Sequence, residues 1–76
     1  MNPELCILEA LQSSYPRGLR VEVLNSDLRS SGRDISLTEQ HRHCRNLERK
    51  AQVTIISGQD HTYIKITPDG LGRLAE

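Results

Sequence analysis

The sequence predicts a single α+β domain with three helices, then a β-hairpin and a short last helix. Three observations support this prediction. The chain has 76 residues, which leaves room for one small hydrophobic core. Apolar side chains recur with helical spacing as far as residue 50, and β-branched residues then alternate with a period of two. Proline and glycine separate the segments.

The first helix is predicted over residues 3–14 by its N-terminal signals. Asn2 is a favourable N-cap, and Pro3 occupies the first helical position, where its missing N–H is not needed. Pro16 disfavours helical geometry at the residue before it and ends the helix. Leu5 lies outside the apolar stripe. That stripe contains Cys6, Ile7, Leu8, Ala10 and Leu11.

Two further helices are predicted over residues 21–31 and 37–50. The second places Val21, Leu24 and Leu28 on one face, and Gly32 suits a left-handed residue after its end. The third begins with a capping box, in which Ser36 is followed three residues later by Glu39. Its apolar face is expected to pack against the first helix. The residues on that face are Leu37, Cys44, Leu47 and Ala51.

A hairpin is predicted over residues 52–67, because two β-branched runs flank the short loop 58–60. The last helix is expected over residues 68–75, since Thr67 is a suitable cap and Pro68 a suitable first residue. The side chains expected to pack back onto the core are Leu71, Leu74 and Ala75.

This order of elements resembles a winged helix-turn-helix domain over essentially the whole chain. The tract Ile64–Leu71 (IKITPDGL) looks like the x-L-T-x-x-G exit from the wing in the MarR and PadR families, and Leu47–Val53 (LERKAQV) is similar to their L-E-x-x-G-L-V. The chain also resembles small stand-alone winged-helix proteins of phages and prophages. It departs from the pattern at Ala51, where the families have glycine. Either the helix continues into the strand, or Ala51 takes a left-handed conformation that costs about 1 kcal/mol or more.

The resemblance implies a small transcriptional regulator whose third helix reads the major groove of double-stranded DNA. Arginine can pair with guanine and asparagine with adenine, so the outward face of this helix has suitable chemistry. The same residues are also typical of a solvated helix face. The predicted groove-reading residues are Thr38, Arg42, Arg45, Asn46 and Arg49, and the predicted phosphate contacts are Lys50, Arg33 and Lys65.

Charge leaves a second interpretation open. Ten basic residues balance ten acidic ones, which excludes a histone-like binder. Residues 17–50 hold eight basic and five acidic side chains, a net +3, whereas the rest hold two and five, a net −3. The hairpin tip contains Asp60 and no lysine or arginine, so we expect a structural hairpin there rather than a minor-groove contact. The alternative function is therefore a winged helix that binds a protein partner instead of DNA.

Other functions find little support in the sequence. His41, His43, Cys44 and His61 lack the spacing of a zinc site, so no metal is predicted. No nucleophile elbow, phosphate-binding loop or carboxylate pair is present, so we expect neither an enzyme nor a small-molecule substrate or cofactor. The two cysteines are expected to be small buried hydrophobes.

Localisation and assembly follow from the same features. No apolar stretch is long enough to span a bilayer and no signal peptide is evident, so a cytoplasmic protein without membrane association is expected. A lone domain presents one recognition helix, so we expect a monomer or weak dimer that places two copies on DNA. Leu5 and Val23 lie outside the apolar stripes and are the candidates for a contact between copies.

Overall fold

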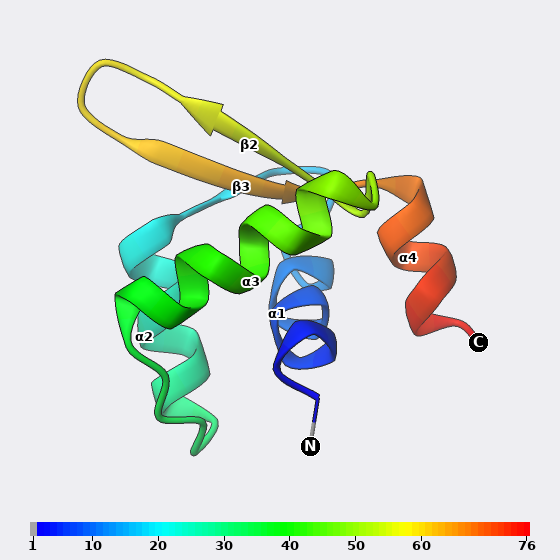
Figure 1. Ribbon diagram of the computed structural model, residues 1–76, viewed down its shortest axis with the longest axis horizontal. Helices are drawn as coiled ribbons and strands as arrows, with labels where there is room; N and C mark the ends of the chain where they lie inside the picture. Colours follow the sequence, from blue (N-terminus) through cyan, green and yellow to red (C-terminus); the bar gives the residue numbers. More distant parts are fainter. Residues whose placement is uncertain (1) are drawn as a thin grey trace.

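The computed structural model describes residues 2–76. The α+β class and the expected order of helices and hairpin are found, with one additional strand between the first two helices (Figure 1). In chain order the elements are α1 (Pro3–Gln12), β1 (Leu19–Arg20), α2 (Val21–Ser30), α3 (Leu37–Arg49), β2 (Val53–Ser57), β3 (Thr62–Ile66) and α4 (Pro68–Leu74).

Side-chain caps define the start of three helices. The Asn2 side chain accepts a hydrogen bond from the N–H of Glu4 at 2.9 Å, and Ser36 Oγ accepts one from Glu39 at 3.1 Å. Thr67 Oγ1 accepts one from Gly70 at 3.2 Å. Each bond satisfies a donor that the first helical turn leaves without a partner. The remaining helix, α2, begins after Arg20 without a side-chain cap.

The sheet has three antiparallel strands in the order β1-β3-β2. Only the hairpin was predicted from the sequence, so β1 is a correction. Leu19 pairs with Ile64 and Arg20 with Tyr63, and two residues are too few to show an alternating pattern. All four helices lie on one side of the sheet, and the β2–β3 hairpin projects beyond them (Figure 1).

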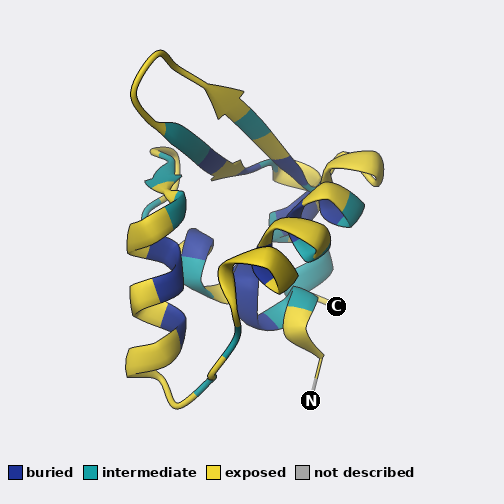
Figure 2. Cartoon of the chain, turned by 60° about the vertical axis from the view of Figure 1, so that its left-hand side comes forward, coloured by how far each residue is buried: buried dark blue, intermediate teal, exposed yellow. Residues whose placement is uncertain are grey.

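The core lies between the helices and the inner face of the sheet. Figure 2 shows buried segments directed toward the centre and exposed segments along the hairpin tip. Both cysteines are in this core, as expected, and Leu5, which lies outside the apolar stripe of its helix, is partly buried against it. The fully or nearly buried apolar residues are Cys6, Ile7, Leu8, Leu11, Leu24, Leu28, Cys44, Leu47, Val53, Ile64 and Ile66.

The buried face of α3 differs from the predicted one. Leu37 is 50% exposed, and Gln40 is fully buried in its place. Gln40, Cys44 and Leu47 follow at intervals of four and three residues, which is the spacing of one helix face. Leu37 stands in the first turn, before this face meets the core. Ala51 and Ala75, which were also expected to pack inward, are exposed.

Ala51 adopts the left-handed conformation, with φ of +60°. Its N–H donates to the carbonyl of Glu48, and the N–H of Gln52 donates to that of Leu47, both at 3.0 Å. These two bonds form a Schellman motif, which ends α3 and turns the chain into β2. Of the two alternatives that the sequence left open, the left-handed residue is therefore the one found.

Gly70 fills a place that no larger residue can occupy. A Cβ at this position would collide with the carbonyl oxygen of Gln52 and with the side chain of Ile66. The glycine therefore lets α4 pack directly on the chain that links α3 to β2. This contact gives a physical reason for glycine in the T-x-x-G tract after the hairpin.

Among residues 2–76, no helix combines the length and the apolar character needed to cross a bilayer.

Candidate functional site

Three arginines form a basic stripe on the exposed side of α3. Arg42, Arg45 and Arg49 are spaced by three and four residues and all are exposed. At 100° per residue they lie within about 60° of one another and extend over about 10 Å of the helix axis. Within residues 2–76, no hydrogen bond or ion pair engages their guanidinium groups. We call these three residues the arginine stripe.

The neighbours of the stripe are polar. Thr38 is exposed on the same side of α3, and Asn46 is half-buried at its edge. Glu39 and Glu48 are exposed and flank the stripe, one on each side by helical spacing. The face therefore presents three free cations with a hydroxyl and an amide beside them.

A buried polar pair fixes α3 against α2. Asn25 Nδ2 donates to Gln40 Oε1 at 3.0 Å and to the Ile35 carbonyl at 2.9 Å. Gln40 Nε2 in turn donates to the Val21 carbonyl at 3.0 Å. Leaving either amide without these partners would cost about 1–3 kcal/mol, so the pair holds the angle between the helices. The pair therefore sets how far the arginine stripe projects.

Neither member of this pair was predicted from the sequence. Gln40 precedes Cys44 by four residues and Leu47 by seven, so its position on the apolar face was the signal that could have identified it. Asn25 carries the same signal, because it follows Val21 by four residues and precedes Leu28 by three on the apolar face of its helix.

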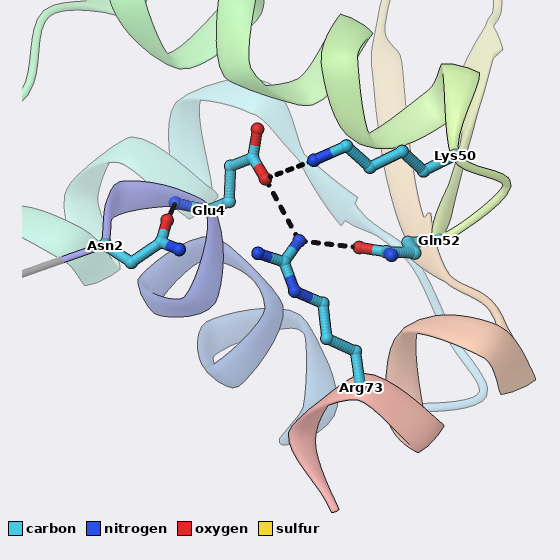
Figure 3. A network of polar contacts seen from close by, with 5 residues as sticks. All are labelled: Asn2, Glu4, Lys50, Gln52 and Arg73. Atoms are coloured by element: carbon cyan, nitrogen blue, oxygen red, sulfur yellow. Dashed lines mark hydrogen bonds and ion pairs between the residues drawn. The ribbon is translucent and has the colours of Figure 1, made fainter. Parts of the chain in front are cut away.

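Lys50 lies apart from the arginine stripe. Figure 3 shows its side chain reaching from the end of α3 to Glu4, where Nζ lies 3.0 Å from Oε1. Arg73 of α4 donates to the same oxygen at 3.0 Å and to Gln52 Oε1 at 2.8 Å. The ammonium group predicted to contact phosphate is therefore engaged in joining α3 to α1.

Glu4 is the centre of this network, and its side chain is only 14% exposed. Burial by itself would raise the pKa of Glu4. The hydrogen bonds and positive charges of Lys50 and Arg73 together outweigh that effect and hold the pKa below its ordinary value. Glu4 therefore remains ionised at neutral pH and links the first helix to the last.

The other two predicted phosphate contacts also lie off α3. Arg33, in the loop after α2, is half-buried and donates through Nη1 to Cys6 Sγ at 3.0 Å. Lys65 is exposed on β3 and pairs in register with Thr54, on the face of the sheet opposite the core. The structure thus brings five of the eight predicted residues together on α3 and distributes the other three over separate surfaces.

The remaining groups considered in the sequence are the Cys44 thiol, the histidine and acidic side chains, and the hairpin loop. Burial raises the pKa of Cys44 to about 12, so this thiol stays protonated at neutral pH and is a poor nucleophile or ligand. In residues 2–76 no three histidine, cysteine or acidic side chains gather in a group that could hold a metal ion. The hairpin loop between Ser57 and Thr62 is exposed and contains Asp60 without a cation.

Comparison with protein-family models, with curated proteins and with solved structures gives no match for this chain.

Proposed function

We propose that this chain is a winged helix-turn-helix domain that binds double-stranded DNA, with α3 in the major groove, and that it acts as a small transcriptional regulator. The element order supports the proposal, because α2 and α3 supply a helix-turn-helix and the β2–β3 hairpin supplies a wing. Any side chain at position 70 would collide with its surroundings, so this place requires glycine. That requirement supports the resemblance of the tract to the wing exit of winged helix-turn-helix domains, which has glycine at this place.

The observation that carries the proposal is the arginine stripe. Free guanidinium groups on one exposed helix face fit the paired acceptors O6 and N7 of guanine, and each such contact discriminates against a wrong base by about 1–3 kcal/mol. Asn46 and Thr38 beside the stripe add groups that can bond to base edges or phosphates. A helix with its side chains is about 10–12 Å in diameter, which suits a major groove about 12 Å wide.

The Asn25–Gln40 pair supports the same conclusion. A recognition helix must keep one orientation relative to the helix before it, since its side chains reach the bases only at a defined depth in the groove. Here the buried amides supply that constraint through hydrogen bonds of 2.9–3.0 Å.

The test is a salt-dependent binding titration on duplexes of random sequence and on duplexes from the neighbourhood of the gene. Arg42→Ala and Arg45→Ala are each expected to weaken a specific site by about 1–3 kcal/mol. Arg29→Ala is the charge-matched control, because Arg29 is exposed on α2 and lies 3.7 Å from Asp34. Equal effects of all three substitutions would show that net charge, and not the stripe, governs binding.

The alternative is a winged helix that binds a protein partner. The zero net charge and the Asp60 tip favour this alternative, since phosphate neutralisation supplies most of the non-specific affinity for DNA. Duplex affinity that is absent at low salt, or that is unchanged in both Arg42→Ala and Arg45→Ala, would favour the protein partner.

A further inference from the structure

The outward face of the sheet is a second surface that no helix covers (Figure 1). Tyr63 pairs in register with Arg20 on one side and with Ile56 on the other, so these three side chains share a face. Lys65 follows two residues after Tyr63 and lies on the same face beside Thr54. Ile64 and Ile66, which alternate with them, are buried on the opposite face. We call the uncovered side the outward sheet face.

Apolar and aromatic groups lie on this face. Ile56 is 48% exposed. Tyr63 is half-buried, and its ring contacts that of His61 edge-on, with centroids 6.3 Å apart. Beside the strands, Tyr15 is 44% exposed and lines a shallow hollow of about 300 Å³ together with Ile56 and Lys65. The two tyrosines are the only Phe, Trp or Tyr residues of the chain, and both border the outward sheet face.

The charge of this face has one sign. β1 and β3 contribute Arg20 and Lys65, both exposed, and none of the three strands contains an acidic residue. The nearest carboxylates in sequence are Glu22 in α2, Asp60 in the hairpin loop and Asp69 in α4, all outside the strands. A sheet face whose strands hold cations and no carboxylate is complementary to a polyanion.

The aromatic rings decide which polyanion fits. A duplex keeps its bases stacked inside and offers only their edges and its phosphates, whereas a single strand exposes the flat faces of its bases to aromatic side chains. A peptide of acidic residues alone would satisfy the cations, but it has no ring to stack on Tyr63 or to enter the hollow beside Tyr15. Single-strand binders combine both features, a stacking surface and a positively charged track for the backbone.

We propose that the outward sheet face binds single-stranded DNA, with bases stacked on Tyr63 and beside Tyr15 and with phosphates at Arg20 and Lys65. This activity does not depend on the duplex binding proposed for α3, because the two surfaces share no residue.

The test is titration of labelled oligo(dT) of about 12 nucleotides, a length within the range of known single-strand sites, with binding measured by fluorescence anisotropy of the strand. Because the chain contains no tryptophan, its intrinsic emission comes from tyrosine, and this emission should be quenched on binding. Tyr63→Ala should weaken binding roughly 5- to 150-fold, and Tyr63→Phe, which keeps the ring, should preserve it. Lys65→Ala should reduce the slope of log K against log salt by about 0.7.

The controls separate this site from the arginine stripe. Arg42→Ala should leave the affinity for oligo(dT) unchanged. Circular dichroism will show whether Tyr63→Ala unfolds the sheet; if it does, Lys65→Ala still tests the proposal, because the side chain of Lys65 is exposed and lies outside the core. Failure to bind oligo(dT) at low salt, or binding that neither Tyr63→Ala nor Lys65→Ala weakens, would overturn the proposal. So would an equal loss in Arg42→Ala, or stronger competition from a polyglutamate peptide than from unlabelled oligo(dT).

Discussion

Glu4 is the residue on which three separate elements depend. Its carboxylate accepts from Lys50 at the end of α3 and from Arg73 in α4, while its own N–H is capped by Asn2 at the start of α1. A carboxylate that is largely removed from water and has two cationic donors is stabilised in its charged form. The network is therefore a contribution to stability that varies with pH.

We predict that acid removes the contribution of Glu4. Its folded-state pKa is lowered, so the stabilisation is complete above the unfolded pKa of about 4.3 and is lost as the pH falls below it through the folded value. Glu4→Gln should lower the free energy of unfolding by about 1–2 kcal/mol at neutral pH. Urea denaturation at pH 7 and at pH 3 should show that this difference shrinks in acid; a difference that stays constant would contradict the assignment.

Ala51 gives a second prediction at the scale of one residue. A φ of +60° strains a non-glycine residue in the folded state by about 1–2 kcal/mol, and glycine would relieve this strain. Glycine would also give the unfolded chain more conformational entropy, which lowers the stability of the fold by about 0.4–1 kcal/mol. Ala51→Gly should therefore stabilise the protein by about 0.5–1 kcal/mol in urea denaturation. Ala75→Gly is the control: because Ala75 has an ordinary φ of −83°, this substitution should destabilise the protein.

At the scale of elements, α4 is held against the body by contacts along its whole length. Thr67 caps its first turn and also donates to the Ala51 carbonyl at 2.6 Å, Gly70 packs on Gln52, and Arg73 reaches Glu4. The helix has seven residues, too few to be stable in isolation. Its position therefore depends on these tertiary contacts.

The two glycines of α4 should respond in opposite directions. Gly70→Ala should destabilise the domain by about 2–3 kcal/mol, because the added methyl meets backbone that must move. A Cβ at Gly72 would meet no described atom within 4 Å beyond its own stretch of helix, so Gly72→Ala should stabilise the domain by about 0.5–1 kcal/mol through helix propensity. Thermal unfolding of both variants tests the pair; equal shifts would show that α4 does not pack closely on this segment.

The sequence predicts elements well where the signal is local. The cap of Asn2 followed by proline, and the Ser36–Glu39 box, correctly locate the starts of α1 and α3. Strand β1 has two residues and owes its existence to pairing with β3, so no local pattern reveals it. Gln40 shows that a helix face can bury an amide when its partners are present, which a count of apolar residues does not anticipate.

The same distinction applies to the candidate site. The arginine stripe could be predicted, because the phase of one helix determines which side chains point outward. The ion pair of Lys50 could not be predicted, since its partner Glu4 is 46 residues away in the sequence. Arg33 likewise contacts Cys6 across 27 residues. Contacts of this kind depend on the tertiary arrangement and have no signature in a single sequence.

At the scale of the whole molecule, size limits what one copy can do. One domain of 76 residues presents a single α3, and single DNA-binding modules bury only about 600–1,000 Å². Regulators with one recognition helix per chain commonly gain affinity by placing two copies on paired half-sites. Of the two candidates for a contact between copies, Leu5 packs against the core, whereas Val23 is 43% exposed on α2.

We therefore predict a monomer or weak dimer in free solution and two copies on a specific duplex whose half-sites are about 10 bp apart, one helical turn. Sedimentation velocity of the free protein and of its complex measures both states. Moving the half-sites apart by about a further 5 bp would place the second copy on the opposite side of the duplex, so cooperative binding should disappear. Val23→Lys should reduce cooperativity on the shorter spacing and leave binding to one half-site unchanged. A complex of one protein with each duplex at both spacings would show that each α3 acts alone.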